Sequence, residues 1–157
     1  MVITDAVVDF LGVARSVSIG TCDARKMPFA TRAAALRARP DRVHVSVFLA
    51  EQLAAAPLRH VAETGRLAVQ VSNPLDHRTV QLKGQVVGTG PAPEADRDFI
   101  EHYLAELALA VDQLGMPRER VMRMSHWPAI VLELQVAEVF LQTPGPGAGT
   151  RLAGRTL

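Results

Sequence analysis

Apolar and polar residues alternate along six stretches of this chain, which is the pattern of β-strands with one buried face. The alternation is clearest where Val43, Val45 and Val47 are separated by His44 and Ser46. Because short polar turns separate the first three stretches, we expect them to form an antiparallel meander. The predicted strands cover residues 16–22, 28–37, 43–48, 66–72, 78–87 and 129–142.

Other stretches carry apolar residues at the spacing of a helix, and the longest of these covers residues 94–114. A second helical stretch, 51–63, contains Pro57 and is followed by Gly65. An interior proline removes a hydrogen bond and crowds the preceding turn, so we expect two pieces here, with Pro57 near the start of the second. Glycine is a common helix terminator, which predicts an end at Gly65. Shorter helices are predicted over residues 4–14 and 118–124.

Six strands with helices inserted after the third and the fifth predict a fold of α+β class. The expected architecture is a mostly antiparallel six-stranded barrel, or strongly curled sheet, with flanking helices. We predict a single domain over residues 1–143. The remaining residues, 144–157, begin with a run of glycine and proline that disfavours regular structure, and we expect this tail to order only against a partner subunit.

Composition narrows the classes of partner. The 17 Lys and Arg residues nearly balance the 16 Asp and Glu residues, and this argues against nucleic acid or an anionic membrane as the main partner. The chain has no apolar run long enough to span a membrane and no recognisable signal segment. The classes of partner that remain are small molecules and other proteins. The single cysteine, Cys22, excludes an internal disulfide and fits a reducing compartment, so we predict a cytoplasmic protein.

Aromatic residues make up only 4% of the chain, so the core consists mainly of small aliphatic side chains. Dimerisation would help such a chain to bury more of its apolar surface. The histidines are not paired at the i+3 or i+4 spacing of a helical metal site, and we expect no metal centre, although a heme held by one histidine stays open. The histidines are His44, His60, His77, His102 and His126.

Basic residues on predicted strands are the most informative candidates for chemistry. Arg32 and Arg37 lie on either side of an alanine-rich run that includes Ala33 and Ala34, and Arg78 precedes Thr79 at the start of the fifth strand. A guanidinium held on a rigid strand can bind a phosphate, and the alanines allow a flat group or another backbone to approach. The alternative is that these residues form a solvated outer face.

Several short motifs, taken in their order along the chain, carry a resemblance to a known family. They are Val17-Ser18-Ile19-Gly20-Thr21, Pro28-Phe29-Ala30-Thr31-Arg32, residues 43–48, Thr64-Gly65-Arg66-Leu67-Ala68-Val69, Arg78-Thr79-Val80-Gln81-Leu82-Lys83-Gly84 and residues 136–142. This ordered set resembles the FMN-binding split barrels of the pyridoxamine 5'-phosphate oxidase-like superfamily. The resemblance implies a homodimer with FMN at the interface between the subunits.

The resemblance also implies which residues contact the cofactor. The segment from Arg32 through Ala33 and Ala34 to Arg37 matches the strand that binds the FMN phosphate. Val47 and Phe48 match the strand end that borders the flavin, and Thr79 matches a polar side chain on the next cofactor strand. The resemblance also makes Arg78 a candidate for a further phosphate contact. The segment 151–155 resembles the terminal element that closes the site from the second subunit, and no catalytic residue is predicted.

The sequence departs from the oxidase pattern in the region after the third strand. The oxidase has an Arg-Lys pair there that binds the FMN phosphate, whereas residues 53–57 contain no basic residue. We therefore predict an FMN-binding oxidoreductase of unknown substrate and keep two alternatives. One is a non-catalytic module of the same fold that binds heme or a deazaflavin, and the other is a structural dimer without a ligand.

Overall fold

The computed structural model describes residues 2–154 and contains the helices and strands that the sequence pattern predicts. Helices that flank the sheet are α1 (Asp5–Leu11), α2 (Ala55–Thr64), α3 (Arg97–Asp112) and α4 (Arg118–Met122), with 3-10 turns η1 (Glu51–Leu53) and η2 (Glu94–Asp96). The strands are β1 (Ser16–Cys22), β2 (Pro28–Ala33), β3 (Ala35–Ala38), β4 (His44–Ala50), β5 (Arg66–Ser72), β6 (Thr79–Pro91), β7 (Ala129–Leu141) and β8 (Arg151–Gly154).

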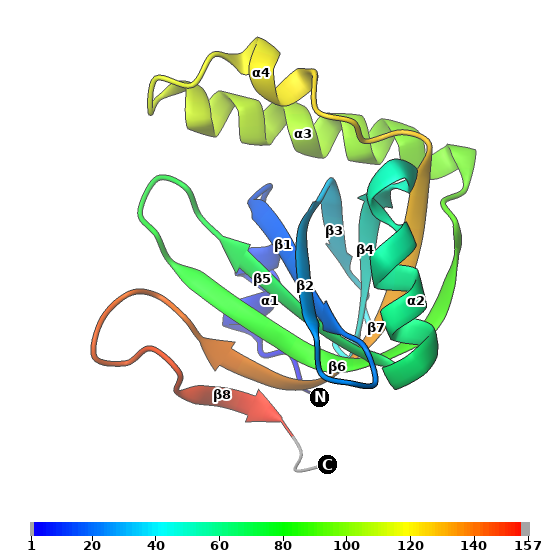
Figure 1. Ribbon diagram of the computed structural model, residues 1–157. Helices are drawn as coiled ribbons and strands as arrows, with labels where there is room; N and C mark the ends of the chain where they lie inside the picture. The colour runs from blue at the N-terminus through cyan, green and yellow to red at the C-terminus, as the bar shows by residue number, and fades with distance from the viewer. Residues whose placement is uncertain (1, 155–157) are drawn as a thin grey trace.

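The sheet curls into a barrel in which all neighbouring strands are antiparallel (Figure 1). Its strand order is β2-β1-β5-β6-β7-β4-β3. Only Ala34 separates β2 from β3, so the two ends of the sheet belong to one bent segment and the barrel closes there. The N–H of Ala34 donates a hydrogen bond of 2.7 Å to the carbonyl oxygen of Phe48 on β4. The predicted α+β barrel is therefore confirmed.

The number of strands differs from the prediction in two places. The strand predicted over 28–37 is divided at Ala34, because its first half pairs with β1 and its second half pairs with β4. The tail contributes β8 as a further strand, so residues 2–154 contain eight strands. The six predicted stretches all form strands, and the sixth ends at Leu141.

Small aliphatic side chains fill the barrel, as the low aromatic content predicts. Val17 and Ile19 of β1 and Leu82 of β6 are buried inside it, whereas Ser18 and Gly20 point to the outer face. Figure 1 shows α3 and α4 lying across one end of the barrel and α2 lying against its side. No helix within residues 2–154 is both long enough and apolar enough to cross a membrane.

The break predicted at Pro57 is confirmed. The turn η1 ends at Leu53 and α2 begins at Ala55, which places Pro57 in the first turn of α2, where the missing N–H costs no helical hydrogen bond. The helix ends at Gly65, which has a φ of 68° and donates its N–H to the carbonyl oxygen of Val61. Glycine adopts this left-handed conformation without steric cost.

Part of the tail forms regular structure with its own chain. Residues 151–154 form β8, which pairs with β7 of the same chain, with Phe140 opposite Arg151. The physical reason is that β4 pairs with β7 only up to Gln135, which leaves the following residues of β7 with a free edge. Residues 155–157, which include the end of the predicted terminal element, lie outside the described residues. The expected contact of the tail with a partner subunit stays a prediction, as does the domain boundary at residue 143.

Candidate functional site

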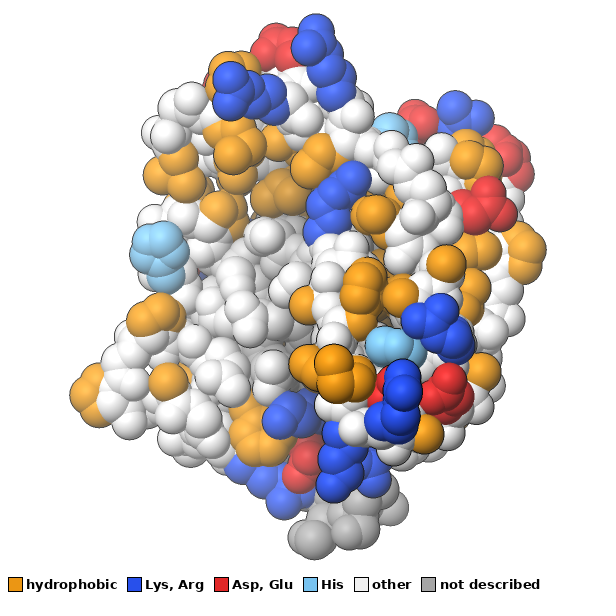
Figure 2. Space-filling view, in the orientation of Figure 1, with side chains coloured by type: hydrophobic (Ala, Val, Ile, Leu, Met, Phe, Trp, Pro, Cys, Tyr) orange, Lys and Arg blue, Asp and Glu red, His pale blue; other side chains and the backbone are white. Residues whose placement is uncertain are grey.

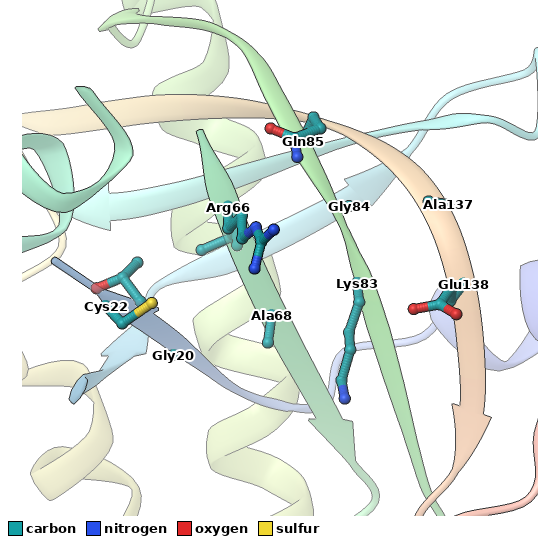
Figure 3. A pocket seen from close by; sticks show the side chains of 11 residues that line it. Gly20, Cys22, Arg66, Ala68, Lys83, Gly84, Gln85, Ala137 and Glu138 are labelled. Atoms are coloured by element: carbon teal, nitrogen blue, oxygen red, sulfur yellow. The ribbon is translucent and has the colours of Figure 1, made fainter. Parts of the chain in front are cut away.

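A groove of about 450 Å³ lies on the outer face of the barrel, where β1, β5, β6 and β7 run side by side (Figure 3). Its floor is formed by four small residues, namely Gly20, Ala68, Gly84 and Ala137. Figure 2 shows this face of the molecule hollowed, with basic side chains at the rim of the hollow. The volume is within the range of roughly 300–1,000 Å³ that is usual for small-molecule sites.

Strand register brings the floor together from distant parts of the chain. Gly20 pairs with Ala68, Ala68 pairs with Lys83, and Lys83 pairs with Glu138, so these residues form one row across the outer face. A side chain in this row stands on the solvent side, because its neighbours along each strand are the buried residues of the barrel. The small side chains of Gly20 and Ala68 leave the backbone of β1 and β5 accessible in this row.

A β-bulge deepens the floor between β6 and β7. Lys83 pairs with Glu138 and Gly84 pairs with Val136, which leaves Ala137 as the extra residue. A Cβ atom at Gly84 would fall onto the carbonyl oxygen of Gln135 and within 2.9 Å of its carbonyl carbon. Only glycine therefore fits at this position, and the two strands approach each other closely beneath the groove.

The walls of the groove carry more positive than negative charge. Arg66 on β5 forms no ion pair with any residue between 2 and 154, and its guanidinium extends over the floor between β5 and β6 (Figure 3). Lys83 likewise has no carboxylate partner there, and its ammonium lies 4.7 Å from the centre of the Phe140 ring. Glu138 is the one acidic residue in the lining, and it is paired with Arg151 at 3.2 Å.

Arg32 adds a further positive charge to the same outer face. It lies on β2 opposite Ser18, one row away from the Ala30 and Gly20 pair, and it has no ion-pair partner within the described chain. Partial burial lowers the pKa of its guanidinium, because removal from water disfavours the charged form. A partly desolvated guanidinium without a partner is suited to bind an anion.

The other basic residue predicted on that strand, Arg37, lies elsewhere. It is on β3, beyond the bend at Ala34, and it forms an ion pair of 2.8 Å with Asp96. Its guanidinium also stacks at 4.0 Å over the ring of Phe99 on α3. Arg37 therefore joins the barrel to α3 and lines a separate cavity of about 340 Å³ between α1, β3 and α3.

The remaining predicted cofactor residues fall into two further groups. The first group is buried in the core around the closure of the barrel and comprises Ala33, Ala34, Val47 and Phe48. The second group lies at the start of β6 and comprises Arg78, which is paired with Asp76 at 2.7 Å, and Thr79, which is buried and hydrogen-bonded to Ser72. The structure brings none of the eight predicted residues into the lining of the groove, although Arg32 shares its face. Their role in binding a cofactor stays a prediction.

Sequence reasoning missed the four residues of the floor as a site. All four lie in motifs that carry the resemblance, one in each of four motifs, and none of them was predicted to contact a cofactor. The available signal was that Gly20, Ala68 and Ala137 occupy positions that the alternation assigns to the outer face, where long polar side chains are usual. Their convergence depends on a register between strands that no local pattern displays.

The histidines do not form a metal site. His60 is buried, and its Nδ1 atom lies 3.1 Å from the hydroxyl oxygen of Thr21. Residues 2–154 contain no group of three or more His, Cys, Asp or Glu side chains that could hold a metal ion. None of the histidines in that range lines the groove.

Comparison with known proteins shows the fold but no close relative. No family model and no curated protein matches the sequence. A protein of Lactobacillus delbrueckii assigned as a pyridoxamine 5'-phosphate oxidase superimposes with a TM-score of 0.54 at 16% identity, covering 88% of this chain and 93% of that chain. An F420 reductase superimposes with a TM-score of 0.53 at 10% identity, covering 83% and 93%.

A third solved structure, an FMN-binding protein of Syntrophomonas wolfei, has a TM-score of 0.52 at 12% identity and covers 83% of this chain and 84% of that chain. These similarities extend over most of the sequence. The chain therefore has the split-barrel fold of the pyridoxamine 5'-phosphate oxidase-like proteins.

Proposed function

We propose that this protein is an FMN-binding oxidoreductase that acts on a small-molecule substrate and holds its cofactor in the outer-face groove. The observation that carries the proposal is the combination of a backbone floor with unpaired basic side chains. FMN has the matching chemistry, because it joins a flat ring system to a phosphate dianion. When bound, a flavin supplies hydride or electron transfer, while the protein supplies binding and orientation.

The residues of the groove fit a planar ring. Gly20, Ala68 and Ala137 have at most a methyl group, so a ring can lie against the strands at van der Waals distance. Gly84 lets β6 and β7 approach each other closely beneath the floor, because a Cβ at this position would fall onto the backbone of Gln135. These small residues support the proposal that a flat ring lies against the strands of the groove.

The basic residues of the same face fit a phosphate. Arg66 and Lys83 line the groove and have no acidic partner among residues 2–154, and Arg32 lies on the neighbouring row. Hydrogen bonds from a guanidinium to phosphate are charge-assisted and are stronger than neutral ones. These residues would replace the Arg-Lys pair that is missing from residues 53–57.

The proposed functional form is a homodimer with the cofactor between the subunits. The groove lies on an outer face of the barrel and is open to solvent in a single chain (Figure 2). A flavin bound there would expose one face of its ring, and a second subunit would cover it and exclude water. This arrangement also provides additional buried surface for a chain with few aromatic residues.

A deazaflavin is the second candidate, and the similarity to an F420 reductase favours it. The deazaflavin F420 also combines a flat ring system with anionic groups, so the same groove chemistry would hold it. Heme is less well supported, because no histidine between residues 2 and 154 lines the groove. A structural dimer without a ligand would leave the unpaired charges of Arg66 and Lys83 without a role.

The test begins with the absorption spectrum of the purified protein and with fluorescence titrations of FMN and riboflavin. Because riboflavin lacks the phosphate, the groove should bind FMN more tightly. Arg66→Gln should raise the Kd for FMN by about tenfold and leave riboflavin binding nearly unchanged, since a charge-assisted hydrogen bond is lost. Arg120→Gln on α4, which does not line the groove, is the matched control and should change neither value.

Two results would overturn the proposal. One is a colourless protein whose thermal stability is unchanged by FMN, because a ligand that binds the native state must raise its stability. The other is an equal loss of FMN and riboflavin binding in Arg66→Gln. A thermal shift with F420 and none with FMN would identify the deazaflavin as the cofactor instead.

A further inference from the structure

We infer that Arg151, on the C-terminal strand β8, sets the anion affinity of the groove by holding Glu138 in an ion pair and thereby leaving Lys83 available to the ligand. This inference rests on the proposed function, because it concerns the same groove. It assigns to the tail an electrostatic role within its own chain. Arg151 acts through Glu138 and Lys83, so it is a positioning residue.

The geometry of β8 places Arg151 beside Glu138. Arg151 lies opposite Phe140, and Gly154 lies opposite Glu138, so the strand follows the free edge of β7. One guanidinium nitrogen of Arg151 is 3.2 Å from Oε1 of Glu138. The two side chains are partly exposed, at 35% and 28% of their surface, so water screens this pair less than a fully exposed one.

Glu138 is also the cross-strand neighbour of Lys83. The two residues are directly opposite each other on β7 and β6 and lie on the same outer face. Residues in such a pair have Cβ atoms about 4.5–5.5 Å apart, within reach of an ion pair. Figure 3 shows the carboxylate of Glu138 on the side of the groove where Lys83 lies.

Lys83 and Glu138 nevertheless form no ion pair in the described part of the chain. The ammonium group of Lys83 lies over the ring of Phe140 instead, at 4.7 Å. Arg151 and Lys83 are therefore competitors for one carboxylate. Arginine is the stronger partner, because its planar guanidinium matches a carboxylate and is more weakly hydrated than an ammonium group.

The competition determines the charge that a ligand meets. With Arg151 in place, Glu138 is neutralised from the side of the tail, and Arg66 and Lys83 both face the ligand with a free positive charge. Without Arg151, Glu138 would stand in the groove as an unpaired anion and would draw Lys83 into a pair. The groove would then present one positive charge fewer to the ligand phosphate.

The experiment compares the Kd for FMN with the Kd for riboflavin in four variants. Arg151→Gln should raise the Kd for FMN by roughly five- to tenfold, the order expected for a unit charge several ångströms from a phosphate at a partly exposed site, and should leave riboflavin within about twofold. Glu138→Gln should bind FMN at least as tightly as the wild type. The double variant R151Q/E138Q should recover the wild-type affinity for FMN, and Arg151→Lys should retain most of that affinity.

Persistence of the Arg151→Gln defect in the double variant would overturn the inference, because the role of Arg151 would then be to dock β8. An equal loss of riboflavin binding would overturn it for the same reason. The salt dependence of FMN binding provides a second readout. Its slope should decrease in Arg151→Gln, since one fewer cation faces the phosphate, and should be restored in R151Q/E138Q.

A measurement without ligand separates this inference from the proposed function. If the wild type binds neither FMN nor F420, the proposed function fails, and the inference is then judged from denaturation. A double-mutant cycle combines Lys83→Gln with Glu138→Gln and compares the equilibrium constants for unfolding. The coupling factor between the two substitutions should be near one in the wild type and about two or more in the Arg151→Gln background. Equal coupling in the two backgrounds would overturn the inference.

Discussion

Substitution of Gly84 by alanine tests the close approach of β6 and β7 beneath the groove. The new Cβ would fall onto the carbonyl oxygen of Gln135, within 2.9 Å of its carbonyl carbon and within 3.1 Å of the Ala137 nitrogen. All of these are backbone atoms, so no side chain can rotate away, and β7 must move at the bulge. Overpacking of this kind costs 1–3 kcal/mol or more, and we expect the upper end, about 3 kcal/mol.

The assay is urea denaturation, supported by a thermal melt. For a chain of this length a loss of about 3 kcal/mol corresponds to a decrease in Tm of roughly 6–12 °C. Gly20→Ala is the matched control, because a Cβ at Gly20 would have no atom within 4 Å. Its free energy of unfolding should stay within about 0.5 kcal/mol of the wild type.

The same pair of variants separates stability from binding. Gly20 lies in the floor of the groove, so Gly20→Ala should weaken FMN binding while the protein stays stable. Gly90→Ala, which also has open space around it and lies outside the groove, should change neither property. A Gly84→Ala protein as stable as the wild type would refute the reasoning about the bulge.

Three further predictions concern other parts of the chain. Burial raises the pKa of Tyr103 to about 12. Because this is the only tyrosine of the sequence, absorbance at alkaline pH should report its ionisation at about 12 while the fold persists. The raised pKa stabilises the fold fully below pH 10, and this contribution to the free energy of unfolding should disappear as the pH rises from 10 to 12. Hydrogen bonds from the backbone and side chain of His44 lower the pKa of Asp41 to about 2. The charged carboxylate therefore contributes stability above pH 4, and this contribution declines as the pH falls toward 2. Denaturation at several pH values should show that Asp41→Asn removes this pH-dependent contribution. Arg37→Leu should lower the free energy of unfolding by about 1–2 kcal/mol, because it leaves the partly buried carboxylate of Asp96 unpaired, whereas R37L/D96N should recover part of this loss.

Much of the fold could be predicted from the sequence because the signals are local. The alternation of Val43, Val45 and Val47 specified a strand regardless of its partners, and Pro57 and Gly65 marked the start and the end of α2. The division of the strand over 28–37 at Ala34 could not be predicted, because both halves have strand composition. The bend follows from pairing with β1 on one side and with β4 on the other.

The candidate site was less predictable than the fold. Arg32 and Arg37 are five positions apart, and the sequence pattern placed them together, but the bend at Ala34 directs Arg32 to the outer face and Arg37 to α3. The residues next to an arginine in the sequence do not show whether its side chain pairs with a carboxylate of the fold, as Arg37 does with Asp96, or with a ligand. Only the position of the opposite charge distinguishes the two.

The sequence by itself determined the class of the fold, the order of its elements and the faces of its strands, because hydrophobic periodicity and chain-breaking residues act over a few positions. The tertiary structure decided which small residues of different strands meet. Gly20, Ala68, Gly84 and Ala137 come from four strands, and their assembly into one floor depends on strand register and on the bulge beside Gly84. The charge of the groove was also decided at this level, since it depends on β8 bringing Arg151 to Glu138 across a turn that the local sequence leaves unspecified.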